Sequence, residues 1–206
     1  MTQSKTLRRW ELALLLGVAL AALLGVWLDG AQAALSDRVI RLHVLANSDS
    51  EADQALKLRV RDRVLERATE LLEQSADRQE AEALLRGNLL ELENLAAEEI
   101  AAAGYDYPVT AELTDTTFPT REYDGFTLPA GEYLALRIVI GEGAGQNWWC
   151  VVFPPLCTTA SADVPASALA AGLTQEDVNL ITEEPGYVLK FKTVELWERL
   201  RAALEG

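Results

Sequence analysis

The stretch Tyr133–Phe153, YLALRIVIGEGAGQNWWCVVF, organises the second half of the chain. Its apolar residues fall at alternate positions from Leu134 to Ile140, which predicts a strand with one face on the core. Glycines at 141, 143 and 145 interrupt the pattern, and the apolar run 148–153 predicts a second strand. We therefore expect a stiff hairpin, in which glycine supplies the positive φ angles of a tight loop.

The three alternating glycines resemble a nucleotide-binding fingerprint, Gly141-x-Gly-x-Gly, only superficially. They leave one strand and enter another, so no helix N-terminus follows them to receive a pyrophosphate. The sequence therefore predicts no phosphate site here, and no cofactor is expected.

Hydrophobic periodicity outside this stretch predicts an α+β fold, because two helices in succession follow the first strand. Ser50 and Asp53 predict a helix start, and Asp77 predicts another, whose helix Gly104 ends. We expect a mixed or antiparallel sheet of about five strands, packed against two long helices on one side. The expected strands are 39–46, 109–115, 133–140, 148–153 and 187–192; the expected helices are 50–73, 78–103, 175–181 and 194–204.

The first strand should bury the face that carries Ile40, Leu42 and Val44, with Arg41 and His43 on its other face. In the first long helix, Asp53, Lys57 and Arg61 recur every four residues, a spacing that predicts a ladder of ion pairs.

The N-terminus predicts export. Lys5, Arg8 and Arg9 precede an apolar run, Leu12–Leu28, which is followed by the cleavage-type tripeptide Ala31–Ala33. Residues 1–33 are expected to form either a cleaved signal peptide or an uncleaved anchor, and both place one domain, 34–206, outside the cytoplasm. Contact with the membrane is expected only through this N-terminal segment.

The chain is strongly acidic, with a formal net charge of −14. Phosphate backbones and anionic lipids would repel such a domain, so nucleic acid and the membrane surface are poor partners. A protein with some basic surface is the expected partner.

The residues offer little reactive chemistry. A single histidine, His43, and no Cys-x-x-Cys pair argue against a metal site. Cys150 with His43, and Asn147 or Asp49 as the orienting group, would form a thiol hydrolase, which is the alternative to a non-enzymatic role. An apolar strand would raise the thiol pKa instead of activating it. For Cys150 and Cys157 the sequence leaves three alternatives open: a disulfide, two separate buried thiols, or a reactive thiol.

Trp148 and Trp149 are adjacent in a predicted strand, so their indoles point to opposite faces. Either both are buried between the sheet and the elements that cover it, or one contacts a partner, where Trp is enriched.

Several motifs resemble one family. The run Ile40–Asp49, IRLHVLANSD, is followed by Asp53–Asp62, DQALKLRVRD. Further on come Phe118–Arg121, FPTR, and Leu128–Tyr133, LPAGEY, and then Gly143–Cys157, GAGQNWWCVVFPPLC. Together they are similar to the stage II sporulation protein R family over about 38–158, most of the exported domain, whereas the tail 159–206 is less distinctive.

The resemblance implies a function in endospore formation. Members are exported from the forespore across its membrane into the space between the two septal membranes. There they trigger a membrane-embedded aspartic protease, which processes the precursor of the mother-cell sigma factor. The resemblance supplies no catalytic residues. Seven motif residues are candidates for the partner surface: Asn47, Ser48, Asp49, Arg121, Gln146, Asn147 and Trp148.

Overall fold

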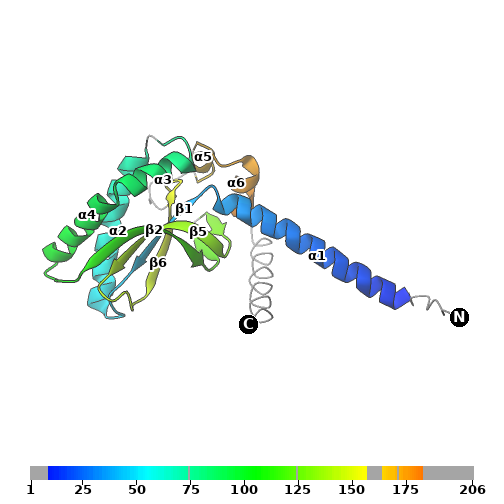
Figure 1. Ribbon diagram of the computed structural model, residues 1–206, viewed down its shortest axis with the longest axis horizontal. Coiled ribbons are helices and arrows are strands. Elements are labelled where there is room, and N and C mark those ends of the chain that lie inside the picture. The colour runs from blue at the N-terminus through cyan, green and yellow to red at the C-terminus, as the bar shows by residue number, and fades with distance from the viewer. Residues whose placement is uncertain (1–8, 74, 124, 157–163, 171, 183–206) are drawn as a thin grey trace.

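The computed structural model describes residues 9–73, 75–123, 125–156, 164–170 and 172–182 (Figure 1). Its elements are α1 (Arg9–Ser36), β1 (Ile40–Leu45), α2 (Glu51–Leu72), α3 (Arg78–Gly87), α4 (Leu89–Ala102), β2 (Val109–Phe118), β3 (Arg121–Tyr123), β4 (Phe126–Leu128), β5 (Gly131–Ile140), β6 (Asn147–Phe153), α5 (Val164–Ala170) and α6 (Gln175–Thr182). The predicted α+β class is confirmed. The strand expected at 187–192 and the helix expected at 194–204 lie outside the described residues.

The main sheet is mixed and has four strands in the order β2-β5-β1-β6. β1 is parallel to β5, whereas the pairs β1–β6 and β2–β5 are antiparallel. The predicted hairpin is therefore wrong, because β1 lies between β5 and β6. Six residues, 141–146, need to span only two strand spacings, about 10 Å, to cross the end of β1. Local alternation cannot distinguish such a crossing from a hairpin.

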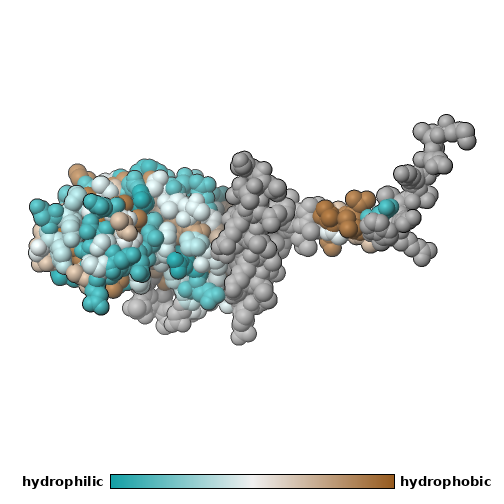
Figure 2. All heavy atoms as spheres, turned by 90° about the horizontal axis from the view of Figure 1, so that it is seen from below, coloured by the Kyte–Doolittle hydropathy of each residue, from teal (hydrophilic) through white to brown (hydrophobic). Residues whose placement is uncertain are grey.

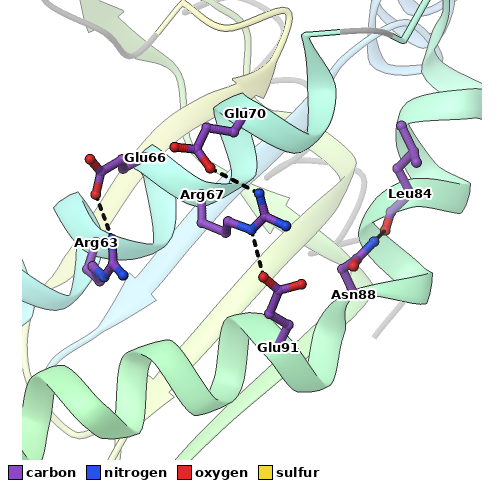
Figure 3. Close-up of polar contacts among 7 residues, drawn as sticks. All are labelled: Arg63, Glu66, Arg67, Glu70, Leu84, Asn88 and Glu91. Carbon is purple, nitrogen blue, oxygen red and sulfur yellow. Dashed lines mark hydrogen bonds and ion pairs between the residues drawn. The ribbon is translucent and has the colours of Figure 1, made fainter.

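Three helices, α2, α3 and α4, cover one face of this sheet, as Figure 1 shows. The strand residues Ile40, Leu42 and Val44 pack there against apolar side chains of the helices, including Leu56 and Val60. On the helix surfaces, ion pairs add to this packing (Figure 3). Arg67 of α2 donates to Glu70 in its own helix and to Glu91 of α4, at 3.0 and 2.7 Å. Exposed pairs of this kind contribute at most about 1 kcal/mol, so the apolar contacts hold the layers together.

The helix predicted over 78–103 is divided in two at Asn88, which adopts φ −115° and ψ 12°. The Asn88 side chain donates to the carbonyl of Leu84 at 2.7 Å, a contact visible in Figure 3. Gly87 and Asn88 are weak helix formers, and this side-chain bond takes the place of a backbone bond. The other helix signals are confirmed: Asp77 caps α3 by accepting from the Glu80 amide at 2.9 Å, and α4 is followed by Gly104 at φ +85°.

The second face of the sheet is also covered, which the sequence did not predict. All six residues of β1 are buried, so Arg41 and His43 lie in the interior. The cover consists of Leu35 at the end of α1, the two-stranded sheet β3–β4, and apolar residues of α5 and α6. The sequence predicts no helix or strand over β3, β4 or α5, because these elements are too short to show periodicity.

Helix α1 extends away from the domain (Figure 1), and its described apolar side chains at 12–20 are exposed, as Figure 2 shows. Among the described residues, no helix meets the length and hydropathy needed to cross a bilayer. The signal peptide or anchor expected at 1–33 stays a prediction.

Candidate functional site

Three loops meet at one end of the sheet. Two loops, 46–50 after β1 and 141–146 after β5, lie beside residues 107–108, which precede β2. The amides of Gly145 and Ala144 donate to the carbonyls of Ala46 and Asn47, at 2.9 and 3.2 Å, and the Gly141 amide donates to Pro108 at 2.7 Å. We call these residues, together with Asn147 and Trp148, the loop end. Backbone bonds from the loop 141–146 to both other segments make the loop end a braced structure.

The glycines of the loop end serve two purposes. Gly141 and Gly143 have φ angles of +58° and +62°, as predicted, a region that side-chain-bearing residues rarely adopt. Gly145 instead allows a close approach, because a Cβ atom there would lie 2.2 Å from the carbonyl oxygen of Ser48. The glycine spacing therefore shapes the loop, and strand β6 follows it.

The buried carboxylate of Asp53 organises the loop after β1. Its Oδ2 accepts from Ser48 Oγ at 2.5 Å and from Asn47 Nδ2 at 3.0 Å. These hydrogen bonds lower the pKa of Asp53, and the bond from Ser48 has a larger effect than the bond from Asn47. The Asp53 amide donates to Ser50 Oγ at 3.1 Å, which confirms the predicted helix start. Hence the side chains of Asn47 and Ser48 already have partners inside the molecule.

Lys57 ties α2 to the loop before β6, so the predicted ion-pair ladder is wrong. Only 4% of Lys57 is exposed, and its Nζ donates to the carbonyl of Gln146 at 2.9 Å. Burial lowers the pKa of Lys57, the nearby Arg61 lowers it further, and Asp49 opposes both. Asp49 Oδ1 accepts from the Gln146 amide at 2.7 Å. The four-residue spacing thus serves contacts between elements and not a ladder along the helix.

Trp148 points toward α2, and its indole is 37% exposed. The Arg61 guanidinium carbon lies 4.1 Å from the ring centroid, a cation–π contact on one side of the indole. Trp148 is therefore a large aromatic side chain held in place at the surface, next to Asn147, which is also exposed. The exposure of Trp148 excludes the alternative in which both indoles of the pair are buried.

Trp149 points to the other face and stacks on His43, with ring centroids 3.8 Å apart and an interplanar angle of 18°. His43 Nε2 lies 2.7 Å from Asn147 Oδ1. Burial lowers the pKa of His43; the Asn147 bond opposes this, and the positive charges of Arg137 and Arg41 reinforce it. The imidazole is thus favoured in its neutral form.

Arg41 was not predicted as a site residue, yet it is a fully buried cation. Its guanidinium carbon lies 4.0 Å from the Phe118 ring centroid, and its Nη2 donates to the Tyr123 hydroxyl. Burial lowers the pKa of Arg41, against the smaller effects of Tyr123 and Tyr133. The only sequence signal for the burial of Arg41 is an arginine within an alternating strand. That signal does not reveal that the two-stranded sheet β3–β4 covers it.

The seven candidate partner residues divide into two locations. Six of them, from 47–49 and 146–148, come together at the loop end. Arg121 lies in β3, opposite Leu128 of β4. Because Tyr123 of the same strand contacts Arg41 near the start of β1, Arg121 belongs to the opposite end of the sheet.

The thiol hydrolase alternative fails on geometry. In the register of β1 and β6, Leu42 faces Cys150 and His43 faces Trp149, so His43 and Cys150 point to opposite faces. Cys150 lies in the helix-side core, 6% exposed, and its sulfur is held in a disulfide. Cys157 lies outside the described residues, so the pairing of the two cysteines stays a prediction. Nor do the described residues contain a group of three or more potential metal ligands.

The fold and the loop end thus define an α+β domain in which one sheet end is a hydrogen-bonded assembly of three loops. Residues 36–163 match the family model of stage II sporulation protein R. The chain belongs to the stage II sporulation protein R family.

A curated relative agrees with this assignment. The chain is 41% identical over 123 residues to stage II sporulation protein R of Bacillus subtilis (strain 168). That alignment covers 60% of this chain and 55% of the relative, so the chain spans little more than half of the relative's length. No solved structure matches the chain.

Proposed function

We propose that the chain is an exported signal of endospore formation. In this role it leaves the forespore through its N-terminal segment and acts in the space between the two septal membranes. There it triggers a membrane-embedded aspartic protease, which then processes the precursor of the mother-cell sigma factor. Family membership over residues 36–163 is the observation that carries this proposal.

The proposed mechanism is a shift between two states of the protease. A ligand favours one state only through a difference in affinity, so the signal needs a surface and no reactive group of its own. The loop end suits this role, because hydrogen bonds already fix its backbone in the free protein. Binding therefore costs little further conformational entropy. Exposed Trp148 and Asn147 are the side chains that we assign to the contact.

Co-expression in a host that does not sporulate tests the proposal. The full chain is produced with the protease and the sigma factor precursor of the same organism, and precursor processing is followed on immunoblots. We expect processing only when the chain is present and exported. Equal processing with and without the chain would refute the signalling role, and a chain lacking residues 1–33 serves as the control for export.

A further inference from the structure

Among the residues that the structure describes, one edge of the main sheet is open. β2 and β6 are the outer strands of this sheet, and β2 is ten residues long and pairs with β5 on one side. The edge of β6 is already engaged, because the Trp149 carbonyl accepts from the Tyr123 hydroxyl at 3.2 Å and the preceding Gln146 carbonyl accepts from Lys57. The edge of β2 is therefore the one to consider for a partner.

The register shows which backbone groups of β2 point outward. The Ala111 amide donates to Glu93 Oε2 of α4 at 2.9 Å, on the side away from β5. Along an antiparallel strand, residues that bond to the neighbouring strand alternate with residues whose backbone groups point away from it. The backbone groups of Leu113, Asp115 and Thr117 therefore point away from β5, as those of Ala111 do. Glu93 satisfies the first of these amides. Within the described part of the chain, no strand or side chain bonds the outward groups from 113 to 117.

We propose that the segment Leu113–Thr117 of β2 binds an extended segment of a partner protein, which adds to the sheet as a fifth strand. Strand addition supplies main-chain hydrogen bonds, and alternate side chains supply the specificity. This interaction is separate from the proposed function. Only its test rests on that function, because the test uses the protease as the partner. An unused row of donors and acceptors is a ready template for such pairing.

Charge identifies the occupant. Asp115 is an exposed acidic residue in the middle of the open segment, and the whole chain carries a net charge of −14. A second copy paired edge to edge would bring like charges together, which is destabilising across strands. The occupant is therefore a segment of a different protein, with Lys or Arg opposite Asp115.

Thr117→Pro tests the backbone contact. The Thr117 amide points outward, so proline there removes no bond to β5, and edge strands tolerate it. Thr117→Val is the matched control, because it changes the side chain and keeps the amide donor. Asp115→Lys tests the charge without relying on proline. Each variant of the full chain is co-expressed with the protease, and the thermal unfolding midpoint, co-purification and precursor processing are measured.

We expect Thr117→Pro and Asp115→Lys to unfold near the wild-type temperature and to retain the protease about tenfold less well, with Thr117→Val unchanged. Tenfold corresponds to the loss of one or two backbone bonds. Wild-type binding by both Thr117→Pro and Asp115→Lys would overturn the edge proposal while leaving the signalling function intact. A wild-type chain that fails to trigger processing would instead overturn the signalling function. A concentration-dependent dimer that Thr117→Pro abolishes would overturn the choice of occupant.

Discussion

Gly145→Ala should destabilise the domain through the loop end. A Cβ at this position would lie 2.2 Å from the Ser48 carbonyl oxygen, 2.5 Å from the Ser48 carbonyl carbon and 2.9 Å from the Ala46 Cβ. All three obstacles are backbone or Cβ atoms of a loop that is itself hydrogen-bonded, so no flexible side chain can move aside. The loops have to separate.

The size of the effect follows from two contributions. Forcing one methyl group into a packed site costs about 1–3 kcal/mol. Separation also weakens the bonds from Gly145 to Ala46 and from Ala144 to Asn47, each with a net contribution of about 1 kcal/mol. We expect a loss of about 3 kcal/mol in the free energy of unfolding. For a domain of this size, that lowers the thermal midpoint by about 6–12 °C.

Gly87→Ala is the matched control for this prediction. Gly87 ends α3 without a positive φ, and a Cβ there would meet no atom within 4 Å. Alanine should therefore stabilise by about 0.5–1 kcal/mol. Scanning calorimetry of both variants gives the comparison. If Gly145→Ala unfolds at or above the wild-type temperature, the close approach of the two loops does not exist in solution.

Three further outcomes are expected. Ser50→Ala removes the cap of α2 and should cost about 1 kcal/mol in urea unfolding, whereas an unchanged midpoint would contradict the cap. The lowered pKa of His43 means that its neutral form stabilises the fold above an unfolded-state pKa of about 6.5, and that this contribution is lost as pH falls toward the folded-state value. The urea midpoint of His43→Gln should therefore fall less between pH 7.5 and 5.5 than the wild-type midpoint, and parallel curves would contradict this. Trp148→Ala should leave the thermal midpoint within a few degrees and reduce protease activation about tenfold or more, as for a binding hot spot, and full activation would exclude the indole from the contact.

Much of the fold is encoded in local patterns. The caps at Ser50 and Asp77, the helix that ends before Gly104 and the strand faces of β1 all depend on neighbouring residues, and each was predicted correctly. Strand order depends on which segment lies beside β5, and alternation within β5 and β6 is the same whether or not β1 separates them. The break at Asn88 follows from a side-chain bond that competes with the helix, which a periodicity of 3.6 hides.

The candidate site was predictable only in part. The motifs identified both segments, 47–49 and 146–148, as candidates for the partner surface. That the two segments lie side by side follows from the pairing of β1 with β6, which the sequence does not show. The mistake with Lys57 has a simple cause: its spacing from Asp53 and Arg61 suits a helical ladder, but Lys57 Nζ reaches the loop before β6. Arg41 was missed because the short hairpin that covers it leaves no pattern in the sequence. In each case a contact between distant segments decides the outcome.

The structure also separates residues that build the loop end from residues that can report on a partner. Asn47 and Ser48 donate to Asp53, so alanine there would disturb the loop and the contact together. Trp148 and Thr117 are cleaner probes, and they lie far apart: Trp148 faces Val44, which pairs with Ile138, whereas Thr117 pairs with Glu132. Six residues along β5 correspond to about 20 Å. At that separation the losses from Trp148→Ala and Thr117→Pro should add if both surfaces contact one partner. A double variant no weaker than the worse single variant would place only one of the two surfaces in the complex.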